Sequence, residues 1–299
     1  MNARIVVVGS LNLDRTYSLG RLPREGESLH ATGHEVASGG KGANQAVAAS
    51  LLGADVRLVG AVGADGAGTL LLDAVAASGV DVTGVRRRPD GSTGEAVIFV
   101  DDDGQNLIVI SPGANATVAA DDVATDDAAW VLSGFEIPDE AVIAAAHHAH
   151  AAAARFVLNP SPYRPIPDAL THAVDVMVVN EHELVEALGA AIDISADAEL
   201  QRARASLSVP QLVVTLGAAG AAAVSGSGVF RAPGHVVTAV DTSGAGDAFT
   251  GALVARLAAG DVLEAATVFA TQVGAHAATR PGTQSSYPTS AELDRWLQG

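Results

Sequence analysis

The chain has no cysteine, and this absence removes several kinds of chemistry at once. Without thiols it can form no disulfide, no thiolate metal site and no cysteine nucleophile. Aromatic residues are also scarce, at 4% of 299 residues, so the core must be packed mainly with alanine, valine and leucine. A chain of this length and composition can bury a large core, and we expect a single α/β domain over residues 1–299.

The sequence also has few positively charged residues. The 17 basic residues are outnumbered by 34 acidic ones, which gives a formal net charge of −17. Such a chain has no general attraction to nucleic acid or to acidic membranes, so we expect neither as a partner. The first apolar run, at residues 5–8, is too short for a signal peptide or a membrane span. We therefore predict a cytoplasmic protein.

Lysine is almost absent, because every basic residue except Lys41 is an arginine. Lys41 lies in G-G-K-G-A-N, where a glycine-rich turn leads into an alanine-rich helix that ends near Gly53. A single lysine can arise by chance. The alternative is a site that needs a compact, flexible ammonium group which a planar guanidinium cannot replace. The turn is thus a candidate anion or polyol site.

A second glycine-rich stretch, V-D-T-S-G-A-G-D-A-F-T-G at residues 240–251, combines a turn with an acid and a helix start. The small residues Gly244, Ala245 and Gly246 allow an anion to approach the backbone N–H groups, and the helix N-terminus favours a phosphoryl group. Asp247 can be a plain first-turn acid. Beside a bound phosphoryl group it can instead accept the proton of an attacking hydroxyl, which predicts a kinase site.

Strands and helices are predicted to alternate along most of the chain. Apolar runs that indicate buried strands occur at residues 4–9, 55–62, 130–133, 155–158 and 174–179. This alternation predicts a mostly parallel central sheet with helices on both faces. Residues 12–37 and 92–111 depart from it, with short alternating segments and a polar hairpin turn. We expect these two segments to form a small β lid.

Polar residues follow several strands at the edge where open α/β sheets hold ligands. Asn12 and Asp14 can receive hydroxyl groups or simply form an Asx turn. Asn180 and Glu183 open a helix, where the acid either suits the helix dipole or holds Mg²⁺ through water beside nucleotide phosphates. A strand that ends in a glycine turn within residues 212–220 suits backbone contact with a nucleotide.

These motifs together resemble those of the ribokinase-like (PfkB) carbohydrate kinases. The resemblance rests on G-G-K-G-A-N-Q-A-V-A-A at 39–49 and on residues 240–251, and N-x-D at 12–14, N-E-x-E at 180–183, T-L-G-x-x-G at 215–220 and T-R-x-G at 279–282 extend it to nearly the whole chain. It implies an ATP-dependent sugar kinase that phosphorylates the 5-hydroxyl of D-ribose. The alternatives are a kinase of the same family for deoxyribose, fructose, a keto-deoxy sugar acid or a nucleoside, and a non-catalytic sugar or nucleotide sensor.

The resemblance also assigns roles to individual residues. Asp247 would be the catalytic base, and the backbone of Gly244, Ala245 and Gly246 would form the anion hole. The sugar would be held by Asn12, Asp14, Gly40, Lys41, Asn44 and Glu136. The nucleotide would contact Asn180, Thr215, Gly217, Gly220 and Gly246, with Glu183 holding Mg²⁺ through water. An activating K⁺ would be bound by Asp241, Ser243, Ala277, Arg280, Gly282 and Ser286, several of them through backbone carbonyls. All of this requires residues near 40 and near 245 to face each other.

Two positions limit what the resemblance implies. Ala270, near the expected adenine position, offers no polar side chain, so base recognition there would rest on shape. Glu95 adds an acid near the expected sugar mouth, where it either changes which sugar fits or points to solvent. Because exposed lid strands invite pairing, we also expect a homodimer built by lid-to-lid contact.

Overall fold

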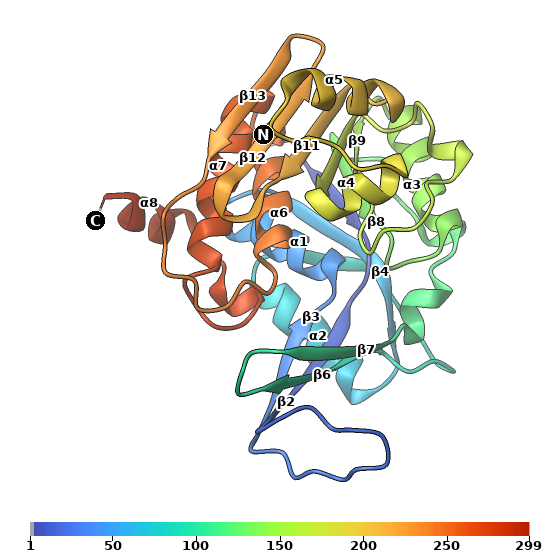
Figure 1. Cartoon of the computed structure of the whole chain (residues 1–299). Helices are drawn as coiled ribbons and strands as arrows, with labels where there is room; N and C mark the ends of the chain where they lie inside the picture. Colours follow the sequence, from blue (N-terminus) through green and yellow to red (C-terminus); the bar gives the residue numbers. More distant parts are fainter. Residues whose placement is uncertain (1–2, 299) are drawn as a thin grey trace.

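The computed structural model describes residues 3–298 and is built around a nine-stranded sheet with the order β13-β12-β11-β10-β9-β8-β1-β4-β5 (Figure 1). The strands are β1 (Ile5–Val8), β4 (Val56–Gly63), β5 (Asp81–Arg88), β8 (Trp130–Gly134), β9 (Arg155–Asn159), β10 (Val176–Asn180), β11 (Gln211–Thr215), β12 (Gly220–Ser225) and β13 (Gly228–Pro233). All pairings from β11 to β5 are parallel, and only β12 and β13 are antiparallel. The predicted mostly parallel sheet is confirmed.

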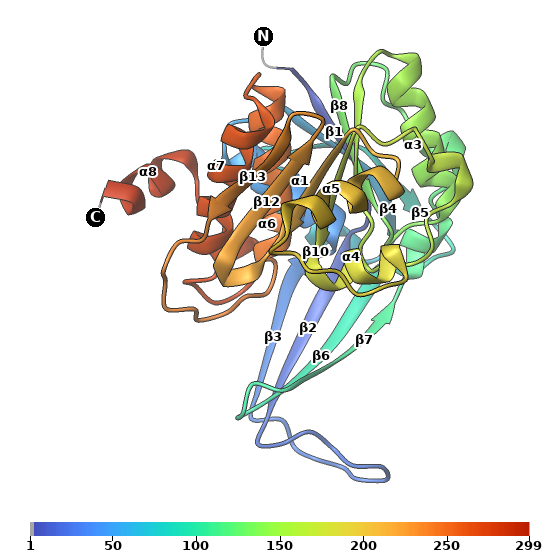
Figure 2. The same ribbon diagram turned by 45° about the horizontal axis from the view of Figure 1, so that its top comes forward.

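Helices cover both faces of this sheet (Figure 2). They are α1 (Lys41–Leu51), α2 (Gly66–Ala77), α3 (Asp139–Ala151), α4 (Glu181–Leu188), α5 (Asp197–Ser206), α6 (Ala245–Ala258), α7 (Leu263–Ala277) and α8 (Ser290–Gln298). Because side chains alternate along a strand, Ile5 and Val7 pack with α1, α2, α6 and α7, while Val6 and Val8 pack with α3, α4 and α5. Each helix in residues 3–298 falls short of the length and apolar character that a membrane span requires.

A second sheet extends from one end of the body (Figure 1). It has the order β3-β2-β6-β7, with β2 (Asn12–Leu19), β3 (Gly33–Gly39), β6 (Gly94–Asp101) and β7 (Asn106–Ser111). The strands come from the two segments that the sequence assigns to a lid, and β2 begins a few residues after the carboxyl end of β1. Its action as a lid and the division of the chain into domains stay predictions.

Close backbone contacts bring the starts of α1 and α6 together. A Cβ atom on Gly251 of α6 would lie 2.4 Å from the carbonyl oxygen of Gln45 in α1, so only glycine lets these helices approach this closely. At the start of α1, a Cβ atom on Gly42 would lie 2.6 Å from the carbonyl carbon of Gly9. The N-terminus of α1 is thereby held between the end of β1 and helix α6.

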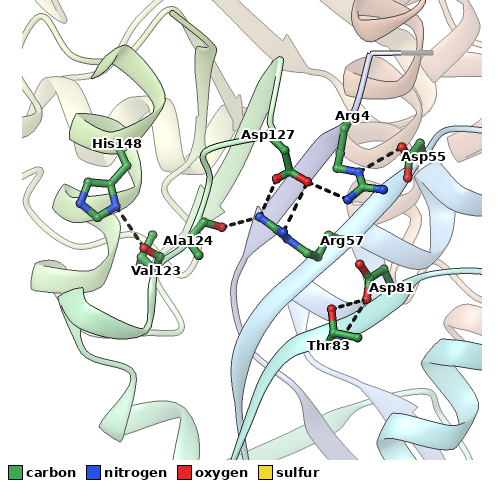
Figure 3. Close-up of polar contacts among 9 residues, drawn as sticks. All are labelled: Arg4, Asp55, Arg57, Asp81, Thr83, Val123, Ala124, Asp127 and His148. Carbon is green, nitrogen blue, oxygen red and sulfur yellow. Dashed lines mark hydrogen bonds and ion pairs between the residues drawn. The ribbon is translucent and has the colours of Figure 1, made fainter. Parts of the chain in front are cut away.

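The opposite, amino ends of the strands carry a group of ion pairs (Figure 3). Arg4, just before β1, pairs with Asp55 at 3.0 Å and with Asp127 at 2.7 Å, and Asp127 also pairs with Arg57 of β4 at 2.7 Å. These side chains are partly exposed, so each pair stabilises the fold by about 1 kcal/mol or less. These ion pairs connect the loop before β8 to the residue before β1 and to strand β4.

Candidate active site

A cavity of about 120 Å³ opens where the N-termini of α1, α4 and α6 meet the carboxyl ends of β9, β10 and β11. It is lined by Lys41, Asn159, Ser161, Val178, Val179, Asn180, Glu183, Thr215, Gly244, Gly246, Asp247 and Thr250. This set includes the lysine, the glycine turn, the aspartate and the strand-end residues that the sequence singled out. A larger hollow of about 430 Å³ lies at the amino ends of the strands and contains none of the predicted site residues.

The two glycine-rich stretches face each other across this cavity. The Asn44 side-chain amide donates a 2.9 Å hydrogen bond to Asp247 Oδ2, although the two residues are 203 positions apart. Both are buried, with 6% and 7% of their surface exposed. The residues near 40 and near 245 therefore face each other, as the sequence interpretation requires.

The turn before α6 is held in a conformation that favours glycine. Gly244 has φ +71°, and a Cβ atom there would lie 2.6 Å from the Tyr287 hydroxyl. That hydroxyl donates to the Gly244 carbonyl at 3.0 Å. Burial, followed by the charges of Asp247 and Asp14, raises the pKa of Tyr287 well above its usual value, so the hydroxyl keeps its proton. In this turn the Ala245 N–H donates to the Thr242 carbonyl at 3.2 Å, which leaves the next N–H groups of α6 available to an anion.

Lys41 is a half-buried cation among carboxylates. The charge of Asp247 is the main reason why the pKa of Lys41 is raised; burial opposes this shift, and Glu136 and Glu183 add to it. The ammonium group therefore stays charged beside the expected base. It can attract both a polyol and a phosphoryl group into the cavity.

Two acids lie where the sugar is expected. Glu136 Oε2 accepts the backbone N–H of Lys41 at 3.0 Å and the Ser10 hydroxyl, which ties it to the start of α1. Asp14 lies over Gly39, where a Cβ atom would be 2.0 Å from its Oδ2. Burial, then the charges of Glu136 and Asp247, raise the pKa of Asp14 to about 7. The region is thus rich in acceptors, and the charge of one of them, Asp14, changes near neutral pH.

Asn12 supplies a donor to the same region. Its Oδ1 accepts a 2.8 Å hydrogen bond from Asn115, which also binds both backbone groups of Leu11 at 3.0 Å. Since the oxygen of Asn12 is engaged, its amide nitrogen is the group left for a ligand hydroxyl. Asn115 was not foreseen from the sequence.

Asn180 and Glu183 form a capping box at the start of α4. Asn180 Oδ1 accepts the Glu183 N–H at 2.8 Å, and Glu183 Oε2 accepts the Asn180 N–H at 2.9 Å. Both line the cavity. The capping role is confirmed, and the role in holding Mg²⁺ and nucleotide stays a prediction. Within residues 3–298 no cluster of three or more His, Cys, Asp or Glu could hold a metal ion. A divalent ion here would take most of its ligands from phosphates and water, with Glu183 as a partner, and the site suits Mg²⁺ on those terms.

The predicted nucleotide contacts divide into two groups. Thr215 lines the cavity, and Gly217 begins an exposed 3-10 turn beside it. Gly220 is buried, and a Cβ atom there would lie 2.1 Å from the carbonyl oxygen of Ala232, so packing of β12 on β13 explains this glycine. Ala270 is completely buried in the core and presents no surface to a base, contrary to its expected place beside adenine.

The residues expected to bind K⁺ come from two adjoining segments. Asp241 accepts the N–H groups of Ser243 and Gly282, each at 2.9 Å. Burial alone would raise the pKa of Asp241, but the hydrogen bonds from Ser243 and Gly282 lower it overall, so the carboxylate stays charged. Ala277 ends α7 and accepts the N–H of Arg280 at 3.2 Å. Ser286 belongs to the second of the two segments and is fully buried.

Glu95 neither reaches the cavity nor points freely to solvent. It forms an ion pair with Arg15 of the neighbouring strand, and both side chains are about one-third exposed. In the β2–β6 pairing, Leu13 lies beside Glu95 and Asp14 lies beside Ala96. Because side chains alternate along a strand, Glu95 and Asp14 are on different faces of the lid sheet. Its expected exposure to solvent is thus only partial.

Besides Asn115, three further buried or half-buried amides were missed by the sequence interpretation. Gln45 donates to Asp247 Oδ1 and to Asn159 Oδ1, each at 3.0 Å, and Gln284 donates to Asn44 Oδ1 at 2.9 Å. Asn159 ends strand β9, so the strand-end rule could have found it. Gln45 directly follows Asn44 in the lysine motif. No pattern in the sequence marks Gln284.

Comparison with known proteins agrees with this geometry. The model of the pfkB family carbohydrate kinases matches residues 2–290. The chain is 36% identical to a ribokinase of Schizosaccharomyces pombe, over 97% of this chain and 96% of the other, and 33% identical to a deoxyribokinase of Salmonella typhi, over 98% of each. A structure of Arabidopsis thaliana ribokinase complexed with ribose and ATP superimposes with a TM-score of 0.92 at 31% identity and covers 100% of both chains. The chain thus belongs to the pfkB family of carbohydrate kinases and is a phosphotransferase with an alcohol acceptor.

Proposed function

We propose that the protein is an ATP-dependent ribokinase, which transfers the γ-phosphoryl group of ATP to the 5-hydroxyl of D-ribose. One observation carries the proposal: the Asp247 carboxylate stands at the N-terminus of α6, hydrogen-bonded to Asn44 and beside the charged Lys41. The names of the relatives, and the ribose and ATP in the Arabidopsis structure, support this choice of substrates.

The residues support a direct transfer. Asn12 and Lys41 donate to the sugar hydroxyls, Asp14 and Glu136 accept from them, and Asp247 takes the proton of the 5-hydroxyl as it attacks phosphorus. The bond from the γ-phosphorus to the bridging oxygen breaks, and ADP leaves. The anion hole predicted at Gly244, Ala245 and Gly246 stabilises charge on the transferred group, and the Ala245 N–H must leave the Thr242 carbonyl to take part. Bound Mg²⁺, near Asn180 and Glu183, would neutralise phosphate charge.

A substrate panel tests the proposal. ADP release is measured with ribose, deoxyribose, fructose and adenosine at equal Mg²⁺·ATP, and kcat/KM should be highest for ribose. Deoxyribose is the second candidate, because a deoxyribokinase is among the relatives. A higher kcat/KM for any other acceptor would reassign the substrate, and no ADP release with any of them would favour a sensor.

Ribose affinity should depend on pH through Asp14. With a pKa of about 7, Asp14 is protonated in the free protein at pH values where an ordinary aspartate is ionised. If ribose hydroxyls donate to the ionised form, Kd should rise by about tenfold per pH unit well below 7 and level off above it. The same shift lowers the free energy of unfolding of the free protein as pH rises from about 4 to about 7.

Isothermal titration of ribose between pH 5.5 and 8 measures this dependence. In Asp14→Asn the affinity should be weaker and nearly flat with pH. An equally steep dependence in that variant would assign the titration to another group.

We propose K⁺ as an activator bound at the segments that hold Asp241. Its carboxylate and the nearby carbonyls offer oxygen ligands, and Tyr287 and Gln284 connect the second segment to Gly244 and Asn44. A bound cation would therefore fix the turn that forms the anion hole. We expect kcat to be several-fold higher in potassium chloride than in tetramethylammonium chloride of the same ionic strength. Equal rates in the two salts would contradict this site.

We also propose a homodimer formed through the lids. Strand β7 is an edge strand whose apolar side chains Leu107, Ile108, Val109 and Ile110 are about half exposed, which invites pairing with a second copy. Ile108→Lys should convert a dimer into a monomer in analytical ultracentrifugation. Leu297→Lys, which changes a similarly exposed residue on α8, is the matched control. A monomeric wild-type protein at micromolar concentration would rule the dimer out.

A further inference from the structure

A chain of buried amides connects Asp247 to the backbone of the central sheet. Asn159 Nδ2 donates to the Val178 carbonyl at 2.9 Å, and Gln45 Nε2 donates at 3.0 Å both to Asn159 Oδ1 and to Asp247 Oδ1. Gln45 is 2% exposed, Asp247 7% and Asn159 8%. Asp247 is therefore linked through two side chains to strand β10.

The Val178 carbonyl fixes the direction of every hydrogen bond in this series of amides. The Val178 carbonyl can only accept, so the amide nitrogen of Asn159 must face it and the amide oxygen must face Gln45. Gln45 in turn must present its nitrogen to two oxygens. A flipped Gln45 amide would set its oxygen against Asn159 Oδ1 and Asp247 Oδ1, which is unfavourable in a buried site.

The two carboxylate oxygens of Asp247 have different surroundings. Oδ1 accepts from Gln45, which is buried and has no part in the proposed sugar site. Oδ2 accepts from Asn44, a residue of the proposed sugar site. The rotation of an aspartate carboxylate about χ2 has only broad minima, so hydrogen bonds rather than intrinsic preference decide where each oxygen points.

We propose that Gln45 is a positioning residue that anchors Asp247 Oδ1 and so keeps Oδ2 directed toward the sugar hydroxyl. The inference rests on the proposed role of Asp247 as the base. Gln45 touches neither sugar nor nucleotide in this scheme, and it acts only through the orientation of the carboxylate. Asn159 completes the arrangement because it holds the Gln45 amide in the donating orientation.

The test replaces Gln45 by methionine, which has a similar length but no donor. Loss of the anchor should lower kcat by roughly 10- to 100-fold, since small misplacement of a reacting group has effects of that order. The KM values for ribose and ATP should stay nearly unchanged. Gln201→Met is the matched control, because Gln201 donates a 2.8 Å hydrogen bond to the Ser225 carbonyl away from the cavity, and its loss should leave both kcat and KM unchanged.

A double-variant cycle separates positioning from general structural damage. If Gln45 acts only through the carboxylate, Gln45→Met should cause no further loss when added to Asp247→Asn, whose residual rate is followed with labelled ATP. The same fold-loss in both backgrounds, or an unchanged kcat for the single variant, would overturn the proposal. Should Gln45→Met fail to fold, as judged by thermal unfolding and ATP binding, Gln45→Glu replaces it: this variant keeps the shape, presents an acceptor, and should also lower kcat.

The outcomes also distinguish this inference from the proposed function. Full turnover in Asp247→Asn would remove the base assignment itself. An inactive Asp247→Asn together with fully active Gln45 variants would remove only the positioning role.

Discussion

Replacing Asp247 by asparagine should lower kcat by about 10²- to 10⁴-fold, the range expected when a general base is lost. Asparagine keeps the shape of the side chain but cannot take a proton from the sugar hydroxyl. The glycine turn and Lys41 do not depend on that proton transfer, so ribose and ATP should still bind. Coupled ADP release gives kcat, and isothermal titration gives the two dissociation constants.

Asp14→Asn provides the contrast, because it removes the half-buried second aspartate of the site without touching the base. It should weaken ribose binding more than it lowers kcat. Near-normal turnover in Asp247→Asn would refute the assignment of Asp247, and lost binding of both substrates would show that its main role is structural.

Adding one methyl group at Gly251 should lower the free energy of unfolding by about 1–3 kcal/mol, as overpacking does in other cores. The new Cβ atom would lie 2.4 Å from the Gln45 carbonyl oxygen and 2.9 Å from the Ala48 Cβ atom, so α1 and α6 must separate. Separation would also draw Asn44 and Gln45 away from Asp247, and kcat should fall. Urea denaturation followed by circular dichroism measures the first effect.

Gly66→Ala is the matched control, since Gly66 lies at the start of α2 and a Cβ atom there meets nothing within 4 Å. Its unfolding free energy should be unchanged or rise by up to about 1 kcal/mol. If Gly251→Ala were equally stable, the close approach of α1 and α6 would not be a constraint on the fold.

The central sheet could be predicted from the sequence because the signals that mark its strands and helices are local. Apolar runs such as Ile5–Val8 and the helices that follow the strands are marked by composition and by glycine, and their alternation determines a parallel sheet. The antiparallel strands β12 and β13 were not foreseen. Their small side chains, as in G-A-A-A-V-S, carry weak strand signals, and only packing against β11 and α7 decides their structure.

The candidate site was predictable where a motif carries it and not elsewhere. Lys41, Asn44 and Asp247 lie in glycine-rich turns that are recognisable in the chain itself. Gln45 and Gln284 act through side-chain contacts between segments up to 240 residues apart, which no local pattern encodes. Gly220 illustrates another difficulty, because a glycine required by strand packing resembles one required by a ligand, and its nucleotide contact stays a prediction.

The lone lysine has a practical consequence for chemical probing. An acylating reagent that attacks side-chain amines would find a single ε-amino group in the whole polypeptide, and that group lies in the cavity beside Asp247. Mass spectrometry of one peptide would then report occupancy of the cavity, and protection by sugar or nucleotide could be followed without any label on the ligand.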